Sequence, residues 1–98
     1  MWGTISKWLE QRQAAKARVR GDAHALLAKN PATAYYDAQR LAARARFAGD
    51  GKKFVHWARV AAEVARIGDS PMDLEVVRAI MDEEEHRAMR GKAPAKQF

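Results

Sequence analysis

The chain has 98 residues, the size of a single domain with one modest core, and a second domain of ordinary size does not fit. It contains no cysteine, so disulfides and thiolate metal sites are excluded, and a reducing, cytoplasmic environment is the expectation. The formal net charge of +6 favours an anionic partner, and no stretch is long and apolar enough to predict a transmembrane helix.

The distribution of glycine and proline predicts helices. The segments between these residues are rich in Ala, Leu, Arg, Lys and Glu, and none of them shows the period-two alternation of a half-buried strand. We therefore expect an all-α fold, a small three- to four-helix bundle formed by residues 1–91 and followed by a flexible tail at 92–98.

The first segment, MWGTISKWLEQRQAAKARVR, predicts a helix over residues 4–20. Its apolar residues at helical spacing are Ile5, Trp8, Leu9, Ala15 and Val19. We expect this face, including Trp8, to pack into the core. Residues 22–29 either continue the helix through Gly21 or form a short helix of their own.

A basic stripe follows the same segment. Arg12, Lys16 and Arg20 lie four residues apart, so they share one side of the helix. We expect the stripe to face solvent while Trp8 packs on the bundle, which divides the helix into a core face and a basic face.

Two segments in the middle of the chain predict a helical hairpin. Asn30 and Pro31 are a good N-cap and first-turn residue for a helix that runs to about residue 48. Gly49–Gly51 ends that helix, and the next one covers about 52–67. A linker this short makes the two helices antiparallel, and we expect this hairpin to form the stable centre of the bundle, with Trp57 as a large core residue.

The last helix is predicted from Ser70 and Pro71, an N-cap and a first helical residue, to about Arg90, with Gly91 as its end. It carries an acidic run at residues 82–85. An internal alternative to partner binding is that this run pairs with the basic stripe, within the chain or across a homodimer.

Three stretches, RVRGDAHALL, AYYDAQRLAARARFAGD and HWARVAAEVAR, resemble a group of short all-helical proteobacterial proteins for which no activity is established. The resemblance spans residues 18–67 and implies a helical fold without implying an activity. More distantly, LAARARFAGDGKKFVHWARVAAEVARI is similar to the helix pair of tetratricopeptide repeats, although no 34-residue period is present.

Candidate residues for metal binding or catalysis are few. Glu83 and His86 have the Glu-x-x-His spacing of di-iron bundles, but such sites need a second motif and two more glutamates. His24 and His56 have no nucleophile or carboxylate at a spacing that forces a catalytic pairing. We therefore expect no enzyme, no metal and no cofactor.

The remaining interpretation is a non-enzymatic interaction or regulatory module that docks a protein partner with an acidic surface. The expected partner-binding residues are Arg12, Lys16, Arg18, Arg20, Arg40 and Arg44. A nucleic-acid binder that adds Arg46, Lys52 and Lys53 is the first alternative. A protein of the anionic membrane surface, anchored by Trp2 and Lys7 beside Trp8, is the second.

Overall fold

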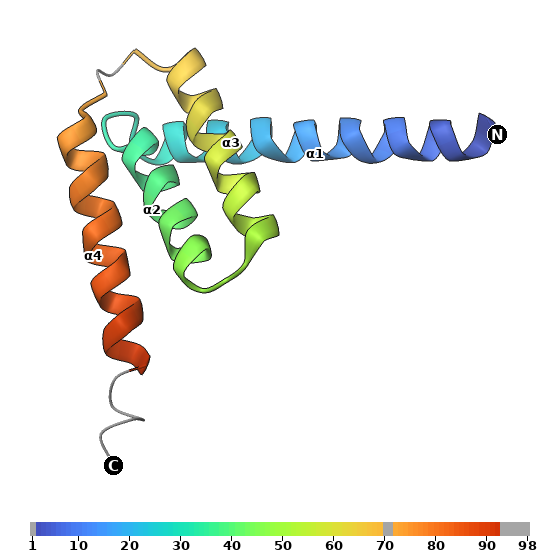
Figure 1. The fold of residues 1–98 in the computed structure, drawn as a ribbon. Helices are drawn as coiled ribbons and strands as arrows, with labels where there is room; N and C mark the ends of the chain where they lie inside the picture. The colour runs from blue at the N-terminus through green and yellow to red at the C-terminus, as the bar shows by residue number, and fades with distance from the viewer. Residues whose placement is uncertain (1, 70–71, 93–98) are drawn as a thin grey trace.

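Four helices make up the fold of the computed structural model, which describes residues 2–69 and 72–92 (Figure 1). They are α1 (Trp2–Lys29), α2 (Ala34–Phe47), α3 (Gly51–Ile67) and α4 (Leu74–Lys92). The described residues contain no strand, and α2 and α3 form an antiparallel hairpin, so the prediction of an all-α bundle with a central hairpin is confirmed. The tail predicted at 92–98 lies outside the described residues except for Lys92, which belongs to α4.

The turn between α2 and α3 depends on Gly49 and Asp50. Gly49 has φ 78°, a left-handed conformation that glycine adopts without a steric penalty. The N–H of Asp50 donates to the carbonyl of Ala45 at 2.9 Å and the N–H of Gly49 to that of Arg46 at 3.1 Å, which is a Schellman ending. The Asp50 carboxylate then accepts the N–H of Lys53 at 3.1 Å and caps α3.

The hairpin begins later than the sequence predicts. Asn30 accepts the N–H of Ala32 on its side chain at 3.1 Å and that of Thr33 on its carbonyl at 3.2 Å. These bonds close a turn over residues 31–33, so α2 starts at Ala34 and not at Pro31.

The start of α4 is also later than predicted. The Ser70 and Pro71 of the predicted cap lie outside the described residues, and the helix begins at Leu74. The Asp73 carboxylate accepts the N–H of Glu75 at 2.9 Å, while its own N–H donates to the Tyr36 hydroxyl at 2.9 Å. Asp73 therefore caps α4 and ties its start to α2.

The core is built mainly from alanine. Its buried cluster consists of Ala23, Ala34, Ala38, Val60, Ala61 and Val64. Small side chains let α1, α2 and α3 approach closely, and half-buried larger residues, Trp57 among them, pack around the cluster. α4 packs on the other side of α2 (Figure 1), where Ile80 is buried.

The long helix α1 settles the question left open at Gly21, because it continues through this residue without a break. Only its C-terminal half packs on the bundle; residues 3–14, here called the arm, are exposed throughout and extend past α3 (Figure 1). Twelve residues correspond to about 18 Å of helix. The radius of gyration is 16.4 Å, against about 13 Å for a compact chain of this length.

The prediction that Trp8 lies in the core is therefore wrong for this chain. Ile5, Trp8 and Leu9 are 53%, 55% and 47% exposed. The C-terminal half of α1 already covers α2 and α3, and a continuous helix carries the arm beyond their edge, so none of the other described helices buries its apolar face. None of the described helices combines the length and apolarity that a membrane crossing demands.

Candidate functional site

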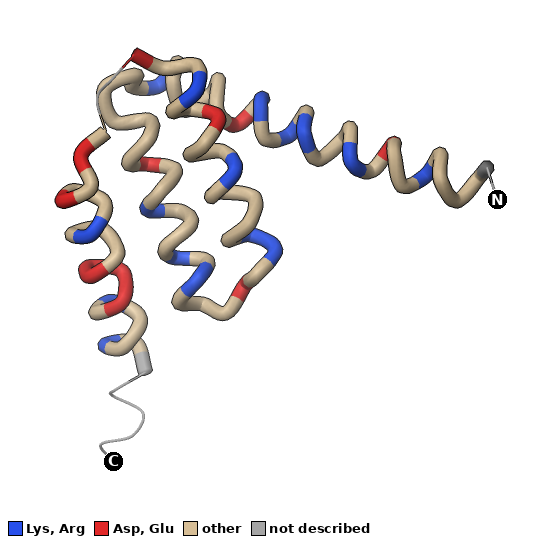
Figure 2. Tube along the Cα trace, turned by 45° about the horizontal axis from the view of Figure 1, so that its top comes forward, with Lys and Arg blue, Asp and Glu red and all other residues tan. Residues whose placement is uncertain are grey.

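Lys and Arg residues recur along α1, and Asp and Glu residues are concentrated on α4, which carries basic residues as well (Figure 2). A groove of about 710 Å³ lies between residues 8–20 of α1 and residues 59–66 of α3. Its charged and aromatic lining includes Trp8, Arg12, Lys16 and Arg20 from α1 and Arg59 and Arg66 from α3. We call this feature the α1–α3 groove.

The apolar and basic residues of α1 share one side of the helix. At about 100° per residue, Arg12 and Lys16 fall in the same sector, about 100° wide, as Ile5, Trp8, Leu9 and Val19. The Arg12 guanidinium carbon lies 5.4 Å from the centre of the Trp8 ring, a cation–π distance. The expected division into a core face and a separate basic face is therefore wrong, because both residue types line the same groove.

One carboxylate lies among the cations of the groove. Glu63 accepts the Nε of Arg66 at 2.6 Å and its Nη2 at 3.0 Å, and its side chain is 14% exposed. The hydrogen bond from Arg66 lowers the pKa of Glu63 against the opposing effect of burial, and the charges of Arg20 and His24 lower it further. Glu63 is thus ionised at neutral pH and offsets one of the five cations.

Arg40 and Arg44 lie elsewhere and are engaged within the chain. The Glu84 carboxylate, only 1% exposed, accepts Arg40 Nη1 at 2.7 Å and Arg44 Nε at 3.1 Å. Arg40 also donates to Glu83 at 3.2 Å. Burial raises the pKa of Glu84, but the hydrogen bonds from the two arginines outweigh it, so the pKa lies below its ordinary value. These bonds join α2 to α4, and they give Glu83 and Glu84 partners other than the basic stripe of α1.

The predicted partner-binding residues thus divide among three places. Arg12, Lys16 and Arg20 line the α1–α3 groove, and Arg40 and Arg44 lie between α2 and α4. Arg18 lines a shallower depression beside α3. For the membrane alternative, Lys7 is exposed on the arm, and the side chain of Trp2 lies outside the described residues.

Sequence reasoning missed the contribution of α3 to the groove. Arg59, Glu63 and Arg66 recur at spacings of four and three on one polar stripe, which is visible in the sequence. The spacing does not reveal that this stripe lies across a groove from α1. That arrangement depends on how α1 is placed relative to the hairpin.

His56 and His86 both form hydrogen bonds with other residues of the fold. His56 Nε2 lies 2.6 Å from an Asp22 carboxylate oxygen and links α3 to α1. His86 bonds through Nδ1 to the Asp82 carbonyl at 2.7 Å, and Glu83 is occupied by Arg40. Residues 2–69 and 72–92 contain no group of three His, Asp or Glu side chains placed to hold a metal ion, and metal-independence remains a prediction.

The chain was compared with protein-family models, curated proteins and solved structures, and none of these comparisons finds a match.

Proposed function

We propose that this protein is a non-enzymatic interaction module that docks an acidic partner protein in the α1–α3 groove. The observation that carries the proposal is the composition of the groove, in which five cations surround a single carboxylate, Glu63, beside the exposed ring of Trp8. Such a concave basic site with an apolar end attracts an anionic partner and also offers it surface to bury.

A protein partner fits these residues better than nucleic acid does. A phosphate backbone favours a continuous basic track, whereas this groove contains an ionised carboxylate. The other basic residues are dispersed: Arg40 and Arg44 are bound to Glu84, and Lys53 lies near Asp50 at the hairpin tip. The charge pattern therefore supports a local acidic ligand.

A flat membrane surface fits less well. The exposed apolar residues Ile5, Trp8 and Leu9 lie on the same side of α1 as Val19, which packs against the core. This side forms a concave corner with α3, whereas an interfacial helix usually presents a convex apolar face to the lipid. Vesicle binding is accordingly an outcome of the test below.

The test compares two double variants with the same change in charge. Arg12→Glu with Lys16→Glu alters the groove, and Lys53→Glu with Arg78→Glu is the control, because neither of these residues lines it. Each protein is titrated with a glutamate-rich polypeptide, random-sequence DNA and RNA, and phosphatidylglycerol vesicles. We expect the groove variant to bind the polypeptide about tenfold more weakly than the control does.

Two results would contradict the proposal. The first is equal loss of polypeptide binding in both variants, which indicates a response to net charge alone. The second is groove-dependent binding of nucleic acid or vesicles without groove-dependent binding of the acidic polypeptide. For nucleic acid, affinity would also fall steeply with salt, by about 0.7 to 0.9 logarithmic units per neutralised phosphate.

A further inference from the structure

We infer that the ligand of the α1–α3 groove is an acidic amphipathic helix of the partner, which lies along α1 with carboxylates at every fourth position and an apolar residue on Trp8. This inference rests on the proposed function and adds the shape and sequence pattern of the ligand.

The spacing of the α1 cations matches the repeat of a helical ligand. Arg12, Lys16 and Arg20 follow one another every four residues, so their attachment points are about 6 Å apart along the helix. A second helix alongside has the same rise per residue, whichever direction it runs. Carboxylates four residues apart on that helix therefore stay in register with all three cations.

The two walls of the groove also favour a helix over an extended strand. Arg59 and Arg66 lie across the corner from the α1 cations, and half-buried Ala15 and Val19 form an apolar floor. A helix presents neighbouring side chains over a broad arc and can reach both walls and the floor together. An extended strand turns alternate side chains to opposite sides, so half of them leave the groove.

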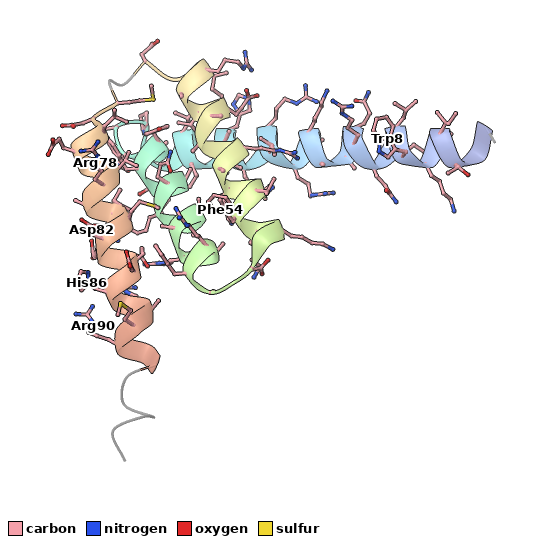
Figure 3. The ribbon with its side chains drawn as sticks, viewed as in Figure 1. Trp8, Phe54, Arg78, Asp82, His86 and Arg90 are labelled. Atoms are coloured by element: carbon pink, nitrogen blue, oxygen red, sulfur yellow. The ribbon has the colours of Figure 1, made fainter. Side chains whose placement is uncertain are left out.

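The end of the groove near Trp8 favours an apolar residue of the ligand. Trp8, labelled on the arm in Figure 3, is 55% exposed, and Ile5 and Leu9 near it in the sequence are about half exposed. Apolar surface therefore continues the basic stripe toward the end of the arm. A helix that follows the stripe reaches this surface one turn beyond Arg12. An apolar residue there buries area on the Trp8 ring, a residue type that often anchors interfaces.

Charge argues against a second copy of this chain as the ligand. Its α1 is itself basic on this side. The exposed carboxylates of its α4, Glu75, Asp82, Glu83 and Glu85, are not spaced four residues apart, and the row labelled in Figure 3 carries Arg78 and Arg90 along with Asp82. Glu84, within the acidic run, is buried against Arg40. The complementary helix therefore belongs to another protein.

Glu63 occupies part of the site that the ligand needs. Its two bonds to Arg66 satisfy a guanidinium that otherwise faces the groove. A ligand carboxylate that reaches Arg66 competes with Glu63, so Glu63→Gln is expected to tighten binding about threefold to tenfold. A gain of affinity separates this effect from general damage to the fold.

The experiment uses synthetic peptides of about 18 residues, a length at which alanine-rich helices begin to form. The first carries glutamates at every fourth position and a leucine one turn beyond each end of the stripe. The second has the same composition with the glutamates on different faces, and the third has the first pattern interrupted by proline. Affinities are measured for the full chain, for Glu63→Gln, for Trp8→Ala and for the double variant Arg12→Glu with Lys16→Glu.

We expect the striped helix to bind about tenfold tighter than either control peptide. Glu63→Gln should strengthen the binding of the striped helix, and Trp8→Ala should weaken it. Equal affinity for all three peptides, with loss in Arg12→Glu and Lys16→Glu, would refute the helical ligand and leave the acidic-partner function standing. No groove-dependent binding of any peptide or of the glutamate-rich polypeptide would refute both.

Discussion

The bundle and the arm contain the same residue types in opposite surroundings. In the bundle, Trp57 packs against the buried core and Arg40 and Arg44 are held by a buried carboxylate. On α1, Trp8 is more than half exposed, and Arg12 and Lys16 line an open groove that contains one carboxylate. Both regions thus contain tryptophan and basic residues, and the two regions differ in how these residues are packed.

The contrast separates arginines that are paired between helices of the bundle from basic residues that line an open groove. A basic residue opposite Glu84 has its charge satisfied within the chain, because burial makes a carboxylate of this kind depend on its partners. A basic residue beyond the edge of the hairpin has no such counterpart. The length of α1 past α3 is thus what turns an ordinary amphipathic helix into a candidate binding surface.

The two tryptophans are expected to give the largest difference. Trp57→Ala removes a ring that packs on the alanine core and should lower the free energy of unfolding by about 3 kcal/mol. Trp8→Ala removes an exposed ring and should change it by less than about 0.5 kcal/mol. Urea denaturation of both variants measures this; comparable losses would mean that Trp8 is buried in solution, by the bundle or by a second copy.

The next largest effect is expected at Glu84. Glu84→Ala removes the buried carboxylate that joins α2 to α4 and leaves Arg40 and Arg44 without it, at an expected cost of about 2 kcal/mol. Glu85→Ala on the exposed side of the same helix is the control and should cost less than about 0.5 kcal/mol. Equal effects in denaturant titrations would show that the interhelical ion pair does not hold α4 in place.

The same carboxylate predicts a response to acid. The folded-state pKa of Glu84 lies below its unfolded-state value, so its stabilisation is complete above the unfolded pKa of about 4.3 and is lost as pH falls through the folded pKa. Glu84→Gln does not titrate and should lose less stability between about pH 7 and about pH 3 than the parent does. Parallel pH profiles of unfolding free energy for the two proteins would contradict this.

A smaller effect is expected at the turn that connects α2 to α3 within the bundle. Gly49→Ala places a β-carbon on a residue with φ 78° and should cost about 1 kcal/mol, although no neighbouring atom lies within 4 Å of that carbon. Gly51→Ala, at a position that is also open but lacks a positive φ, is the matched control. If thermal unfolding shows the two variants to be equally stable, the turn does not require the left-handed conformation.

Much of the fold is predictable from local signals in the sequence. Gly49 and Asp50 predict the hairpin turn because a left-handed ending and a carboxylate cap are local requirements. The first turns of α2 and α4 were predicted about three residues too early. Ahead of α2, Asn30 uses its side chain to close a turn before the helix, and at the start of α4 the Asp73 carboxylate accepts the N–H of Glu75.

The candidate site is less predictable because it depends on where helices end in space. Periodicity places Trp8 on the apolar side of α1, and that placement holds, but periodicity does not say whether another helix reaches that far. It likewise leaves unstated that Glu84 faces Arg40 across 44 residues of sequence. Interactions of this kind arise from tertiary packing, which a helical repeat does not encode.

If the α1 cations bind a partner and the α2 arginines stabilise the fold, neutralising each pair should affect a different property. Arg12→Gln with Lys16→Gln, and Arg40→Gln with Arg44→Gln, remove the same charge from the two regions; melting temperature and affinity for the striped acidic peptide are measured for both. We expect the α1 pair to keep its melting temperature within about 2 °C and to bind about tenfold more weakly. The α2 pair should melt about 10 °C lower and, below that temperature, keep its affinity. Equal losses of affinity in the two variants, or equal losses of stability, would contradict the account.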